Sequence, residues 1–88
     1  VFVTGKKHKI RVHFDAFAAR LIREKTWHPQ QTLIDRENDE VELRVELADL
    51  YEIERWILSW GSHARVLAPA ALKKRVRQHA QAILDQAG

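Results

Sequence analysis

The sequence predicts an α+β domain with a four-stranded antiparallel sheet and an added C-terminal helix. Three observations lead to this fold class. Val41 to Leu47 alternates apolar and charged residues without a break, which is the pattern of a strand with one buried face. The 88 residues are 45% apolar and 31% charged, as in a soluble single domain. The segments also follow one another in the order strand, helix, strand, strand, helix, strand, helix.

The first half of the chain contains a linker, a strand, a helix and a second strand. Residues 1–7 are expected to be a linker or the end of an upstream segment, and the domain is expected to span residues 8–88. Apolar and basic residues alternate over 8–14 and predict the first strand. Asp15 is a suitable N-cap, and the helix after it should end near residue 25 because Pro29 disfavours helix before it. Residues 32–36 predict a short second strand. The apolar stripe of the helix consists of Phe17, Ala18, Leu21 and Ile22.

The second half contains a hairpin, a helix, a strand and a last helix. Asn38-Asp39 predicts the turn into the 41–47 strand. Asp49 and Glu52 have the spacing of a capping box and predict the start of the second helix. Gly61 suits the C-terminal end of this helix. Residues 63–67 predict the last strand, and Pro69 starts the final helix. The second helix has the apolar face Leu50, Ile53, Trp56, Ile57 and Trp60, and the last has Leu72, Val76, Ala80, Ile83 and Leu84.

The first six elements have the order of a ferredoxin-like βαββαβ fold. Right-handed crossovers would place both crossover helices on one face of the sheet. The first and third strands would lie at the centre, with the fourth beside the first. The last helix is an addition that either covers a sheet edge or pairs with another chain.

The composition excludes several classes of function. The chain has no cysteine, so neither disulfides nor thiolate chemistry is expected and the cytoplasm is the expected compartment. It has no apolar run long enough for a membrane span. It also has no methionine, even at position 1, which indicates an excised domain or a C-terminal piece. The net charge is +3, with basic segments at 5–13 and 73–77 around an acidic middle. This distribution suits an anionic ligand or self-association through complementary charge.

Strand parity predicts a candidate anion site on the outward face of the sheet. Guanidinium forks match phosphate and carboxylate geometry. Alternatively, Glu42 and Glu46 pair with the arginines and nothing binds. The face has no aromatic residue on which a base could stack, which leaves phosphate contact as the open possibility. The residues of the candidate site are Arg11, His13, Arg44 and Arg65.

No catalytic, metal or cofactor signature is present, so the chain is not expected to be an enzyme. The five histidines lack the spacing of metal ligands. The three tryptophans are expected to pack in the core, with a role at a partner surface more open for Trp27 because it lies in a loop. The candidate partner surface joins this loop to the last helix and consists of Trp27, His28, Lys73 and Arg77.

Four motifs, in their order and spacing, resemble a known family over about residues 9–85. The family is the C-terminal extension, or WCX domain, of WYL-domain transcriptional regulators. The motifs are Trp27-His28 with Gln31, Val41-x-Leu43-x-Val45, Leu50-x-x-Ile53-x-x-Trp56-Ile57-Leu58-x-x-Gly61 and Val66-Leu67-x-Pro69-x-x-Leu72.

The resemblance implies a bacterial, cytoplasmic regulator with upstream helix-turn-helix and WYL domains. DNA binding and the main effector pocket belong to those domains, which this chain does not contain. It implies a ferredoxin-like module that helps to form a homodimer, adjoins the WYL ligand site and contributes to binding a nucleotide or nucleic-acid effector. The alternative is a stand-alone nucleic-acid-binding module of the same fold.

Overall fold

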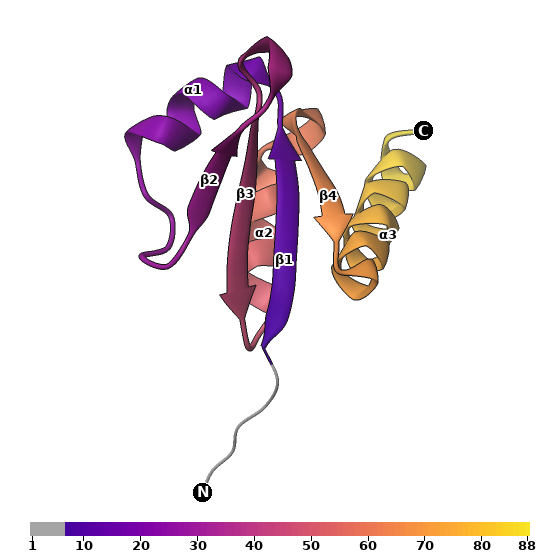
Figure 1. Cartoon of the computed structure of the whole chain (residues 1–88). Helices are drawn as coiled ribbons and strands as arrows, with labels where there is room; N and C mark the ends of the chain where they lie inside the picture. The colour runs from indigo at the N-terminus through magenta and orange to yellow at the C-terminus, as the bar shows by residue number, and fades with distance from the viewer. Residues whose placement is uncertain (1–6) are drawn as a thin grey trace, which may run out of the picture.

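Four strands form a single antiparallel sheet in the order β2-β3-β1-β4, as the computed structural model of the chain shows (Figure 1). The structure describes residues 7–88, so the expected linker lies outside the described part except for the exposed Lys7. The central strands have the predicted bounds, and the α+β class is confirmed. The strands are β1 (His8–Phe14), β2 (Thr32–Asp35), β3 (Val41–Leu47) and β4 (Ala64–Ala68).

Among residues 7–88, three α-helices accompany the sheet. They are α1 (Ala16–Glu24), α2 (Tyr51–Ser59) and α3 (Ala70–Ala87), with short 3₁₀ turns at η1 (Glu37–Asp39) and η2 (Gly61–His63). Figure 1 shows α2 behind the sheet and α3 beside β4, where it packs on β4 and α2. The four-stranded sheet with its crossover helices is consistent with the predicted ferredoxin-like fold.

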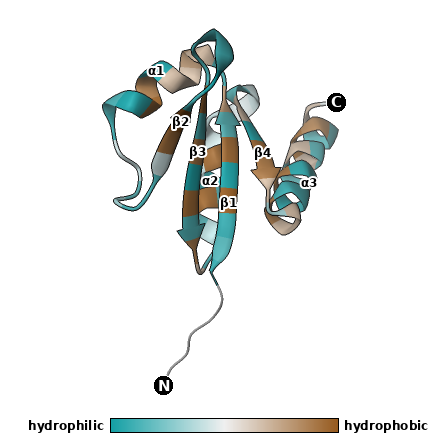
Figure 2. Ribbon diagram, in the orientation of Figure 1, coloured by the Kyte–Doolittle hydropathy of each residue, from teal (hydrophilic) through white to brown (hydrophobic). Residues whose placement is uncertain are grey.

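The core lies between the sheet and the crossover helices. In the β1–β3 register, Ile10 faces Val45 and Val12 faces Leu43, and all four side chains are buried. Figure 2 shows the resulting alternation of hydrophobic and hydrophilic bands along both central strands. One face of the sheet is therefore apolar and covered, while the other face carries the polar side chains.

Local sequence explains the ends of the elements. The Asp15 Oδ1 atom accepts a hydrogen bond from the Ala18 N–H at 3.0 Å, which confirms this residue as the N-cap of α1. Asn38, Asp39 and Gly61 have φ values of 60°, 63° and 61°, as the two predicted turns require. The predicted capping box of Asp49 and Glu52 is wrong. Leu50 is the N-cap of α2, and the Asp49 carboxylate accepts a hydrogen bond from the Tyr51 N–H at 2.9 Å.

Two predicted apolar stripes were partly wrong. In α1, the small Ala18 and Ala19 are buried, whereas Phe17 and Leu21 are 58% and 46% exposed. In α3, Leu72 is fully buried, but every residue from 77 onward is exposed. Within residues 7–88, no helix is long and apolar enough to cross a membrane.

Candidate anion-binding face and partner surface

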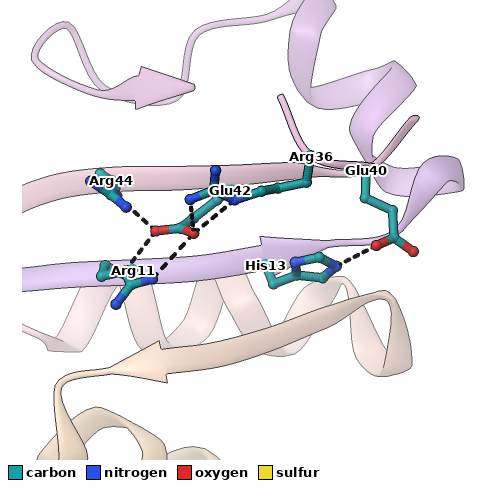
Figure 3. A network of polar contacts seen from close by, with 6 residues as sticks. All are labelled: Arg11, His13, Arg36, Glu40, Glu42 and Arg44. Carbon is teal, nitrogen blue, oxygen red and sulfur yellow. Dashed lines mark hydrogen bonds and ion pairs between the residues drawn. The ribbon is translucent and has the colours of Figure 1, made fainter. Parts of the chain in front are cut away.

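The uncovered face of the sheet is organised around one buried carboxylate. Glu42 points outward from β3, yet it is only 1% exposed because three arginine side chains surround it (Figure 3). Its two oxygens accept hydrogen bonds from Arg11 Nε at 2.6 Å, Arg44 Nε at 2.7 Å and Arg36 Nη2 at 2.7 Å. The contacts join β1, β3 and the turn that follows β2.

The strand register explains why the carboxylate is needed at this position. Arg11 lies directly opposite Arg44, and two like charges facing each other across a strand pair repel. Glu42 lies next to both on the same face and screens one from the other. The hydrogen bond from Arg11, with those from Arg44 and Arg36, lowers the pKa of the Glu42 carboxyl well below its usual range despite the opposing effect of burial. The three guanidiniums therefore favour the ionised form of Glu42 in the folded domain.

Positive charge remains on this face after the ion pairs are formed. Three guanidiniums surround one carboxylate, which leaves an excess of two positive charges. Arg11 and Arg44 also line an open hollow of ≈ 490 Å³, together with Lys9, Thr32 and Gln30. The lining also includes Glu46, which lies directly opposite Lys9 in the strand register. Their side chains are 45% and 47% exposed, so N–H donors beyond those used by Glu42 reach solvent. This arrangement can accept an anionic oxygen group of phosphate or carboxylate type.

The four predicted site residues divide into two places on this face. Arg11 and Arg44 lie together at Glu42. His13 and Arg65 are opposite each other on β1 and β4, and they line a separate hollow of ≈ 360 Å³. His13 Nε2 lies 2.9 Å from Glu40 Oε1, whereas Arg65 makes no ion pair among the described residues.

Acidic groups make the second hollow a poorer anion site. Asp15 Oδ2 lies 2.7 Å from His63 Nδ1 in its wall. The hydrogen bond from the Ala18 N–H, followed by the contact with His63, lowers the pKa of Asp15. Among the described residues, no group of three or more His, Asp or Glu side chains is placed to hold a metal ion.

The predicted partner residues are also in two places. Trp27 is half-buried and stacks on Trp56, with 4.9 Å between the ring centroids. The backbone N–H groups of Trp27 and His28 both donate to Gln31 Oε1, at 3.0 and 2.9 Å, so the glutamine fixes the loop. Lys73 and Arg77 are exposed on α3, on a different side of α2.

A second buried carboxylate attaches α3 to α2. Glu54 is 2% exposed and contacts Arg75 Nε and, at 2.6 Å, His79 Nε2. Burial alone would raise the pKa of Glu54, but the hydrogen bonds from Arg75 and His79 outweigh it and the pKa is lowered. Beyond His79 the helix has no comparable anchor.

Comparison with known families agrees with this architecture. Residues 6–84 match the family described as the WCX domain. The chain belongs to the WCX domain family. No curated protein matches the chain.

The sequence left two charged residues of this WCX domain unassigned. Arg36 lies in a polar turn, and it reaches Glu42 only because the hairpin folds it back toward β3. Glu54 reads as a solvent-facing helix residue until α3 packs against it. One sequence signal was present in each case. Glu42 and Arg44 share a strand face, which indicates an ion pair. Arg75 and His79 are one helical turn apart, which indicates a shared acidic partner.

Proposed function

We propose that this domain is the C-terminal regulatory and dimerisation module of a bacterial, cytoplasmic, WYL-type transcriptional regulator. It performs no chemistry of its own, and the upstream domains of the regulator bind DNA. The observation that carries the proposal is the second half of α3, where Ile83 and Leu84 are 62% and 64% exposed. Membership of the WCX family supports the regulatory setting.

The free half of α3 has the pattern of a helix that packs against another surface. Ala80, Ile83, Leu84 and Ala87 follow the i, i+3, i+4, i+7 spacing of one apolar face. Short helices in water derive most of their stability from packing that face. A second copy of the chain supplies such packing, and dimers with two-fold symmetry are the commonest assembly.

The arginine face supplies the regulatory contact in this proposal. An anionic effector, a nucleotide or a nucleic-acid fragment, places a phosphate in the hollow beside Arg11 and Arg44. The separate hollow beside His13 and Arg65 is not part of this contact, because Asp15 and Glu40 line it. The excess of positive charge around Glu42 supports this role, because phosphate binding releases counterions and needs uncompensated cations.

The solution mass of the domain tests the assembly role. Light scattering is expected to give a dimer for the wild type and a monomer for Ile83→Asp combined with Leu84→Asp. Gln78→Asp combined with Ala82→Asp is the matched control, because it adds two carboxylates on the opposite side of the same helix half. A monomeric wild type, or equal loss in the control, would overturn the dimerisation role.

The effector role is tested in the full-length regulator. Arg11→Ala combined with Arg44→Ala should abolish or strongly weaken the transcriptional response to the effector, while Lys74→Ala, a basic residue on α3 away from this face, should not. An unchanged response in the double variant would remove the arginine face from the proposal.

The alternative, a stand-alone nucleic-acid-binding module, makes a different prediction for the same face. The isolated domain would then bind a short single-stranded oligonucleotide as a monomer, with an affinity that falls steeply as salt is raised. Binding of that kind, lost in the Arg11 and Arg44 double variant, would favour the alternative over the assembly module.

A further inference from the structure

A second uncovered apolar surface lies between α1 and α2. It is a half-open groove of ≈ 640 Å³. Apolar and aromatic side chains dominate its lining, and Glu24 and Lys25 lie at its rim. The main lining residues are Leu21, Ile22, Trp27, Trp56 and Trp60. All three tryptophans of the chain therefore line one groove.

The groove exists because α1 contacts the sheet through small residues. Ala18 and Ala19 are fully buried beneath α1, so the larger Leu21 is turned toward the groove and is 46% exposed. The indole rings of Trp27, Trp56 and Trp60 are only partly buried. Clustered apolar exposure of this kind marks an interaction site in a soluble domain.

We propose that this groove receives the free half of α3 from a second copy of the chain. The inference rests on the proposed dimerisation and names its second surface. Ile83 and Leu84 of one copy pack on Leu21 and the tryptophans of the other. A two-fold axis forms the same contact twice, so each copy both gives a helix and receives one.

Charge and shape favour this occupant. Arg77 borders the apolar row of α3 on the side of Leu84, and Glu24 lies at the groove rim, so two opposite charges come close when the row enters the groove. Neither takes part in an ion pair among the described residues. The row on α3 spans about two turns, or roughly 11 Å along the axis. In the simpler alternative, α3 of one copy packs on α3 of the other. That contact buries only Ile83 and Leu84 of each copy and leaves the tryptophan groove exposed to solvent.

A mixing experiment separates the two arrangements. Leu21→Asp damages only the groove, and Ile83→Asp with Leu84→Asp damages only the helix. Each variant alone is expected to dissociate at least tenfold more readily than the wild type. An equimolar mixture is expected to form a heterodimer, because the intact helix of the first variant enters the intact groove of the second. If α3 instead packs on α3, mixing restores nothing and Leu21→Asp dimerises like the wild type.

Tryptophan emission tests the inference in the unaltered protein. As the wild type is diluted through the range in which its mass halves, the emission should shift to longer wavelength because water enters the groove. A halved mass with unchanged emission would overturn the groove contact and leave dimerisation through α3 standing. A mass that is monomeric at every concentration would overturn both.

Discussion

Glu42→Gln is the sharpest test of how the uncovered sheet face is held together. The carboxylate is 1% exposed and accepts charged hydrogen bonds from three guanidiniums. Hydrogen bonds to charged groups contribute roughly 1.5–3 kcal/mol each. The three arginine side chains are 38–47% exposed. In the variant, water therefore replaces much of the hydrogen bonding that they lose with the carboxylate. After this discount, each contact contributes about 1 kcal/mol at most.

In Glu42→Gln, the side-chain amide keeps one oxygen that accepts hydrogen bonds more weakly than the carboxylate. The expected loss in the free energy of unfolding is therefore about 2 kcal/mol. For a domain of this size, such a loss lowers the melting temperature by roughly 8–16 °C. Glu46→Gln is the matched control, because Glu46 lies on the same face of β3 and is exposed, and it should change stability by less than about 0.5 kcal/mol. Equal urea midpoints for the two variants would refute the argument that Glu42 organises the arginines.

Three further predictions follow from the same structure. The pKa values of Glu42 and Glu54 are lower in the folded state, so the unfolded chain takes up protons first. The stability that these two carboxylates contribute should be constant near neutrality and should fall as the pH drops below about 4.3. The fall should be less steep in Glu42→Gln, as urea titrations at several pH values will show. Glu54→Gln should speed amide hydrogen exchange in α3 far more than in β1 and β3, and equal acceleration in both would argue against a local anchor. Gly61→Ala should cost about 1–2 kcal/mol from backbone strain alone, because φ is 61° and no atom lies within 4 Å of the added Cβ; calorimetry that finds no change would contradict this.

Much of the fold follows from local pattern. The alternation in β1 and β3 fixed both their bounds and their inward faces, because one-sided burial tolerates no shift in register. The turns at Asn38-Asp39 and Gly61 were readable for a different reason, since few residues accept positive φ.

Side-chain burial was harder to predict, because it depends on which elements come together. Periodicity placed Glu42 on the outward face, which is correct, but outward normally means exposed to solvent. Only the pairing of Arg11 opposite Arg44, and the return of Arg36 through the hairpin, enclose the carboxylate. In α1 the pattern was equally good for Leu21 and for Ala19, and the close approach of the helix to the sheet decided in favour of alanine.

The second buried carboxylate connects the fold to the proposed assembly. Leu72 and Val76 pack the start of α3 on the core through apolar contacts, which have no preferred direction. Glu54 contacts Arg75 and His79, which are one turn apart, and two contacts along a helix fix its rotation. Buried ion pairs often add little net stability, but they can specify one arrangement among several. At Glu54, that arrangement determines the direction in which Ile83 and Leu84 face, and therefore whether they can reach a second copy of the chain.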